Sequence, residues 1–232
     1  MDLFEHTTLA TPELYDPAID QLLAPFSEKV TYPAKQTFCM PGKKLDFIYF
    51  IKSGRTKHYM VNADGSTKLI YTLTAGWFFG ETAFFLKTPT SLHSQTETAT
   101  VMYKVPYSIC DNLMATSPAF REAIIKCYSL KVLMLRYEIE NLTFNSAKGR
   151  LKKLFCSAVD LERISNDGQW YDLKIKYNHS ELGEIIGGTR VTICRQVNEL
   201  CNEGFLRSLN HRIQLNAIKY DQYVEDQLSV SD

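Results

Sequence analysis

The sequence predicts an α+β fold in three parts: an N-terminal antiparallel β-roll, one long helix and a C-terminal winged helix-turn-helix. Three observations predict it. Short aromatic and β-branched runs separated by turn residues fill residues 30–105, which is typical of a roll or barrel. Residues 119–143 contain neither Gly nor Pro. Two short helical patterns then flank a glycine pair within residues 178–206. We therefore expect domains at residues 1–117, 118–144 and 145–232.

Composition limits the kinds of partner. Acidic and basic residues balance at 26 each, so any nucleic-acid surface must be local. Met1–Thr11 lacks the charged-then-apolar pattern of a secretion signal, and no apolar run is long enough to cross a bilayer. We expect a cytoplasmic protein with no membrane partner.

Cysteine and histidine usage bears on metals and catalysis. The six cysteines are scattered without a CxxC pair, and the five histidines are equally dispersed. This distribution argues against a metal site and a disulfide framework, so we expect reduced thiols, no metal and no cofactor. The sequence shows no nucleophile–base arrangement and no phosphate-binding glycine loop, and it does not predict an enzyme.

The N-terminal half begins with a helical lead-in over residues 12–27, which Pro12 is suited to open. Asn62-Ala63-Asp64-Gly65 is a strong hairpin signal, because glycine tolerates the positive φ of a tight turn. The expected strands of the roll are residues 47–51, 56–61, 68–73 and 98–105.

The long helix is expected over residues 119–143. Apolar and other residues recur there at three- and four-residue steps, and Ile125, Val132 and Ile139 form a seven-residue series. A helix of about 25 residues is ~37 Å long, more than a small roll covers. Its apolar stripe indicates a partner helix from a second copy of the chain, hence a homodimer.

Residues 145–177 connect the long helix to the glycine-pair region. Asn145 and Ser146 are candidate caps for a helix over residues 147–163, and residues 170–177 suggest a short strand. After Tyr220 the chain is acidic and ends in serines, so we expect that tail to fray.

The most informative stretch is the predicted helix-turn-helix. Asn178 and Glu181 form a capping-box pattern at the start of the first helix. Gly187-Gly188 supplies the turn, Thr189 caps the second helix, and Gly204 stops it.

The first turns of such a second helix enter the DNA major groove, where arginine can pair with guanine. Thr189 and the helix N-terminus are suited to a phosphate. Residues 205–215 suggest a hairpin wing, with Arg207, His211 and Arg212 placed for the DNA backbone. The expected DNA-binding residues are Thr189, Arg190, Val191, Thr192, Cys194, Arg195 and Arg212.

These segments, taken together, resemble the CRP/FNR superfamily of regulators. The matching segments are Pro41-Gly42, Gly54, Asp64-Gly65, Gly76, Phe79-Gly80-Glu81, the long helix, and the residues from Glu181 to Arg195. The resemblance implies a cyclic-nucleotide-binding-like roll and a homodimeric transcription regulator. It also implies an inverted-repeat site on double-stranded DNA, a small-molecule effector and contact with RNA polymerase.

Departures from the family bear on the ligand and on the DNA site. Cyclic-AMP binders carry Arg-Ser where this chain has Thr90-Ser91, so the cyclic phosphate loses its cation. Glu81, which would face a ribose hydroxyl, remains. There is no cysteine cluster before Cys39 for an iron–sulfur centre. Val191 stands where the cyclic-AMP receptor has a base-reading glutamate, which favours an A·T-rich half-site.

Within the family, the chain is most similar to the CprK-type regulators of organohalide respiration. The similar segments are Asp64-Gly65-Ser66, Lys68-Leu69-Ile70-Tyr71, Lys131-Val132 and Val191-Thr192. This resemblance implies a halogenated phenol between roll and long helix, with Tyr71, Glu81, Phe84 and Lys131 as effector residues. Glu81 departs from the branch, where a lysine stands.

Other interpretations stay open at this point. Lys131 would be a solvated helix lysine and Tyr71 a core residue if neither touches an effector. A thiol redox sensor, switched by Cys39, Cys194 or Cys201, and a cyclic-nucleotide-responsive regulator are the alternative functions. A ligand-binding module without a DNA role is a further one.

Overall fold

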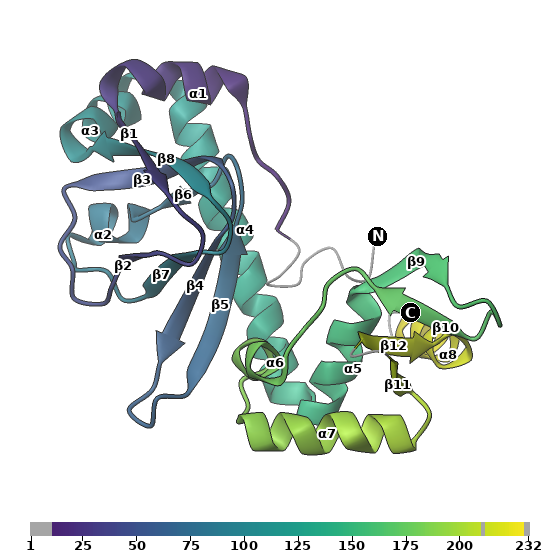
Figure 1. Ribbon diagram of the computed structural model, residues 1–232. Coiled ribbons are helices and arrows are strands. Elements are labelled where there is room, and N and C mark those ends of the chain that lie inside the picture. Colours follow the sequence, from purple (N-terminus) through teal and green to yellow (C-terminus); the bar gives the residue numbers. More distant parts are fainter. Residues whose placement is uncertain (1–10, 210–211, 230–232) are drawn as a thin grey trace. The chain divides into compact units, whose positions relative to one another are not determined.

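The computed structural model describes residues 11–209 and 212–229, which form two compact units (Figure 1). One unit holds residues 11–65 and 69–138, and the other holds 66–68 and 139–229. The expectations for Met1–Ala10 and for His211 lie outside the described residues.

The first unit is built on two four-stranded sheets, as expected for a roll. The first sheet has the order β1-β8-β3-β6 and the second β2-β7-β4-β5. The middle of β3, Ile48–Ile51, is completely buried, because both faces of this strand pack against other elements. The strands are β1 Glu28–Tyr32, β2 Thr37–Cys39, β3 Phe47–Ser53, β4 Thr56–Val61, β5 Thr67–Leu73, β6 Phe78–Phe79, β7 His93–Thr96 and β8 Thr100–Pro106.

Helices cover this roll. The expected lead-in helix begins at Pro17 and not at Pro12, because Asp16 is its cap and accepts a hydrogen bond from the Ala18 amide. Two helices, α2 and α3, were not expected from the sequence. The helical segments are α1 Pro17–Leu23, η1 Ala24–Phe26, α2 Glu81–Leu86, α3 Tyr107–Thr116 and α4 Pro118–Phe144.

The long helix is confirmed, since α4 runs without a break for 27 residues. In the part of the chain that the structure describes, no helix is both long enough and apolar enough to cross a membrane.

The second unit combines helices with a four-stranded sheet of order β11-β12-β10-β9. Helices α5, α6 and α7 contact one another, and α8 packs beside β12. The elements are α5 Ala147–Ser157, β9 Val159–Ile164, β10 Trp170–Leu173, α6 His179–Ile186, α7 Arg190–Asn202, β11 Leu206–Leu209, β12 Arg212–Asn216 and α8 Ala217–Ser229.

Two expectations for this unit are wrong. The helix expected to reach residue 163 ends at Ser157, because the following residues pair with β10 as strand β9. The tail after Tyr220 does not fray at once. It continues as α8 to Ser229, and the Tyr220 ring packs on Tyr171 at 5.7 Å. The wing is confirmed as the antiparallel β11–β12 hairpin.

Candidate nucleic-acid interface and buried ligand site

Local hydrogen bonds fix the start of helix α6. The Asn178 side chain accepts from the amides of Ser180 and Glu181 at 2.9 Å, and the Glu181 carboxylate accepts from the Asn178 amide at 2.9 Å. This is the expected capping box, and it satisfies amides that the first turn of a helix leaves unpaired.

The turn between α6 and α7 depends on glycine. Gly187 has φ of +75°, a left-handed conformation that favours glycine. Gly183 lies against the same turn, and a Cβ atom placed there would approach the Gly188 carbonyl oxygen to 2.7 Å. The glycines therefore allow helices α6 and α7 to pack closely on either side of the turn.

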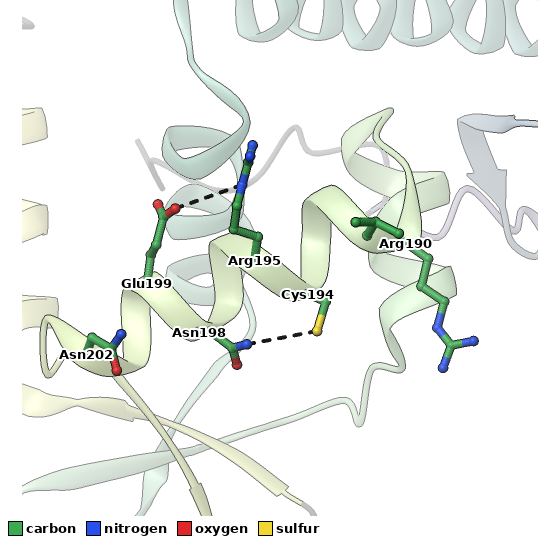
Figure 2. A pocket seen from close by; sticks show the side chains of 7 residues that line it. Arg190, Cys194, Arg195, Asn198, Glu199 and Asn202 are labelled. Carbon is green, nitrogen blue, oxygen red and sulfur yellow. Dashed lines mark hydrogen bonds and ion pairs between the residues drawn. The ribbon is translucent and has the colours of Figure 1, made fainter.

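Helix α7 presents one buried side and one exposed side. Thr189 caps it by accepting from the Thr192 amide at 3.2 Å. Ile193, Val197 and Leu200 are buried. The opposite side lines a pocket, shown in Figure 2, whose residues are Arg190, Val191, Cys194, Arg195, Asn198, Glu199 and Asn202. We call these seven residues the reading face.

The reading face contains most of the residues expected to bind DNA. Val191 is 80% exposed, and the side chains of Arg190 and Arg195 extend from the helix in different directions (Figure 2). Thr189 and Thr192 are not part of it, because their hydroxyl groups face each other at 3.0 Å in the cap. Arg212 opens strand β12 of the wing and is exposed.

Sequence reasoning missed the second half of this face. Asn198 and Asn202 continue from Cys194 at steps of four residues, and Glu199 lies one turn beyond Arg195. The Glu199 carboxylate is 4.0 Å from the Arg195 guanidinium. Steps of three and four residues along the helix from Arg195 would have identified these residues.

The expected effector residues Tyr71, Glu81 and Lys131 meet inside the roll unit. Lys131 Nζ donates to Glu81 Oε1 at 2.6 Å and to the Phe78 carbonyl at 2.8 Å. It also lies 5.4 Å from the centre of the Tyr71 ring. Gly80, with φ of +93°, turns the chain from β6 into α2 and so places Glu81 beside α4.

Burial decides how these groups ionise. Lys131 is 5% exposed and Glu81 2%, so the interpretation of Lys131 as a solvated lysine is wrong. Burial by itself lowers the pKa of Lys131, but the adjacent Glu81 carboxylate outweighs it and raises that pKa above its usual value. Burial raises the pKa of Tyr71.

The remaining predicted effector residue lies one turn further along α2. Phe84 is buried, and its ring packs against Phe85 at 4.8 Å and Tyr107 at 5.0 Å. Tyr71 belongs to the hydrophobic core of the roll as well as to the polar cluster.

One buried polar residue beside this cluster was not expected. His58 is fully buried, with Nδ1 3.0 Å from Ser94 Oγ and Nε2 3.0 Å from Thr56 Oγ1. Its ring lies 5.2 Å from that of Tyr71. Burial lowers the pKa of His58 well below its usual value, and the Lys131 charge lowers it further. The histidine is therefore neutral at neutral pH.

At the position where cyclic-AMP binders carry arginine, Thr90 is buried and has a structural role. Its hydroxyl donates to the Met40 carbonyl at 2.8 Å. All six cysteines are free, and only Cys194 and Cys201 are partly exposed. Within residues 11–209 and 212–229, no three His, Cys, Asp or Glu side chains gather as a metal site would need.

Comparison with known proteins fits this geometry. The family model for the cyclic nucleotide-binding domain matches residues 29–117. The cAMP-activated global transcriptional regulator CRP of Haemophilus influenzae is 23% identical over 196 residues, which cover 83% of this chain and 85% of that protein.

Solved structures share the fold over most of the chain. The c-di-GMP responsive global regulator CLP of Xanthomonas campestris has a TM-score of 0.75 at 20% identity, covering 86% of this chain and 99% of the other. A CRP/FNR family transcriptional regulator from Thermus thermophilus has a TM-score of 0.66 at 22% identity, covering 85% and 98%.

The roll is thus a domain of the cyclic nucleotide-binding kind, and the expected fold class is confirmed. The described chain, with its helix-turn-helix, shares the fold of solved CRP/FNR family transcriptional regulators and is similar in sequence to the CRP protein named above. CprK complexed with OCPA is among the similar structures, with a TM-score of 0.65 at 19% identity, covering 87% of this chain and 92% of that one. The likeness does not separate the branches, so the CprK-type assignment stays a prediction.

Proposed function

We propose that this chain is an effector-responsive transcription regulator that binds an A·T-rich inverted repeat on double-stranded DNA as a homodimer. The reading face is the observation that carries the proposal. It presents two arginines for guanine or phosphate and an exposed valine for a thymine methyl group. The capped N-terminus of α7 adds a phosphate site. Contact with RNA polymerase would follow from DNA binding.

The homodimer would form along α4. Ile125, Val132 and Ile139 are each at least 60% exposed, and the exposed residues Leu135 and Leu142 follow Val132 and Ile139 by three positions each. These five residues, the α4 seam, match coiled-coil spacing, with Ile125, Val132 and Ile139 at one of the a and d positions and Leu135 and Leu142 at the other. Two copies paired there would present two reading faces, one for each half of an inverted repeat, ~34 Å apart.

The effector would bind at Tyr71, Glu81 and Lys131, with Phe84 and its neighbours supplying apolar surface. This place joins α2 and β5 of the roll to α4, so a ligand held there can favour one arrangement of the long helix over another. The proposed effector is a small aromatic compound, a halogenated phenol. The two alternative functions are a thiol redox sensor and a cyclic-nucleotide-responsive regulator. They are tested in the same DNA-binding experiment, with an oxidant or cyclic AMP in place of the phenol.

Fluorescence anisotropy with a labelled A·T-rich inverted-repeat duplex tests DNA recognition at fixed salt. Arg195→Ala should weaken binding about fivefold or more, since a bidentate contact contributes about 1–3 kcal/mol. The matched control is Arg163→Ala, because the side chains of Arg163 and Arg195 are both 69% exposed. Equal losses for the two variants would contradict the assignment of α7.

A further inference from the structure

Helix α7 carries a single acidic residue, Glu199, and this residue belongs to the reading face. Its position is unfavourable in two ways. It lies in the last turn of the helix, where the helix dipole disfavours a negative charge. It also lies on the face that is proposed to approach the DNA phosphates, which repel a carboxylate. Neither helix stability nor attraction to DNA therefore accounts for a carboxylate at this position.

The partner of this carboxylate is Arg195. Glu199 Oε1 lies 4.0 Å from Arg195 Nε, and Figure 2 shows the two side chains extending from the same side of the helix. The Arg195 side chain is 69% exposed and the Glu199 side chain 44%, so water screens the pair and it adds little to the stability of the free protein. Their attraction strengthens when a DNA groove displaces that water, because the effective dielectric constant falls.

The edge of the guanidinium that faces the carboxylate decides what Arg195 can bind. A guanidinium has five N–H donors, one on Nε and four on the two terminal nitrogens. Glu199 faces Nε and does not occupy the terminal nitrogens, which can pair with guanine O6 and N7. An arginine that no carboxylate holds can turn instead to the nearest phosphate, whose oxygens accept the same donors.

The other arginine of the reading face has different surroundings. Four positions after Arg190 the chain has Cys194, whereas four positions after Arg195 it has Glu199. Arg190 also opens the helix, next to backbone amides that are suited to a phosphate. Within the reading face, Arg195 is therefore the arginine that a carboxylate holds.

We propose that Glu199 is a positioning residue, which holds the Arg195 guanidinium toward the base edges and so directs it to guanine instead of the DNA backbone. The inference rests on the proposed function and adds a determinant of base preference to that same reading face. It places a G·C base pair in each half of the otherwise A·T-rich repeat.

The test is the base preference of the full chain, measured by competition anisotropy with duplexes that differ at single base pairs. Arg195→Ala first identifies the base pair that Arg195 reads, as the position where the preference for guanine falls. Glu199→Gln removes the charge of residue 199 and keeps the shape of its side chain. It should lower the preference for guanine at that same base pair by about threefold or more.

The same substitution should strengthen binding that does not depend on sequence. Affinity of Glu199→Gln for a randomised duplex should rise, and the slope of log affinity against log salt should steepen by about one, as expected for one more phosphate contact. The matched control is Glu162→Gln, which removes one negative charge from an exposed position of strand β9 in the same unit. It should leave both the guanine preference and the slope unchanged.

A double-mutant cycle separates positioning from direct contact, because a carboxylate can also accept from cytosine N4 by itself. If Glu199 acts through Arg195, Glu199→Gln should have no effect on base preference in an Arg195→Ala background. Thermal melting followed by circular dichroism should show Glu199→Gln at least as stable as the unaltered chain, since it removes an unfavourable charge from the end of the helix.

An unchanged guanine preference in Glu199→Gln, an unchanged salt slope, or an effect that persists in the Arg195→Ala background overturns the inference. Each of these results leaves the proposed function standing, because the unaltered chain still distinguishes the repeat from a randomised duplex. Failure of the unaltered chain to make that distinction contradicts the proposed function and the inference with it.

Discussion

Glu81 Oε1 and Lys131 Nζ lie 2.6 Å apart inside the roll, and both side chains are almost wholly buried. The residues are 50 positions apart in the sequence, so this contact ties α2 directly to α4. A buried pair of this kind costs desolvation, and removing one partner leaves the other charge uncompensated.

Lys131→Met should therefore destabilise the roll by about 3–5 kcal/mol, because it strands the Glu81 carboxylate. The double change Glu81→Leu with Lys131→Met should recover most of that loss. Urea denaturation followed by circular dichroism measures both. Lys126→Met, at an exposed position of the same helix, is the control. A single variant as stable as the control would mean that the pair is not buried in solution.

His58 should make stability depend on pH. Its folded-state pKa lies well below the usual 6.5, so below about pH 6.5 the unfolded chain takes up a proton that the folded chain does not. Stability from this group is complete above that pH and falls as pH falls, by up to about 1.4 kcal/mol per pH unit. Urea midpoints across this range measure the slope.

The slope, and not the absolute stability, identifies the histidine. His58→Gln should flatten it, whereas His93→Gln should not, because His93 is only half-buried and stacks on Tyr59. An unchanged slope in His58→Gln would assign the acid sensitivity to other groups.

Local signals were read correctly from the sequence, and non-local ones were not. The Asn178–Glu181 capping box and the strand Thr56–Val61 depend on neighbouring residues, and both were predicted. The helix α5 ends early because its continuation forms a hairpin with the following strand, β10, and this pairing outside the helix overrides the helical pattern.

The candidate sites show the same division. A capping residue and the helical spacing of the residues after it were enough to predict the first turns of α7. The burial of Lys131 was not predicted from the sequence of its helix, because its partner Glu81 lies in the roll. The hydroxyl partners of His58 are on strands β4 and β7, one of them 36 positions away, which explains why its role was not found.

The identity of residue 191 should set one position of the DNA site. Val191→Glu supplies an acceptor for cytosine N4, so binding should shift toward C·G at the base pair it faces by about 1–3 kcal/mol. The change is tolerable for the fold because Val191 is 80% exposed. Competition anisotropy with duplexes that differ at single base pairs measures it. Val191→Ala should not create the cytosine preference, and a shift in both variants would argue against direct contact.

The α4 seam should control the oligomeric state. Val132→Glu places a charge in the middle of the seam and should convert a dimer into a monomer, because a coiled-coil position does not tolerate an unpaired buried charge. Sedimentation velocity distinguishes the 26.6 kDa chain from its dimer. Lys126→Glu changes charge at an exposed position beside the seam and should remain dimeric. A Val132→Glu variant that stays dimeric would place the interface elsewhere.

The most direct test of the account is the coupling between ligand and DNA. It compares the affinity of the full chain for the inverted-repeat duplex with and without a dichlorophenol, as a probe for the proposed halogenated phenol, at one salt concentration. The account predicts that the phenol tightens duplex binding about fivefold or more, and that the tightening is lost in the Glu81→Leu with Lys131→Met double variant. Duplex affinity that is the same with and without the probe would contradict it.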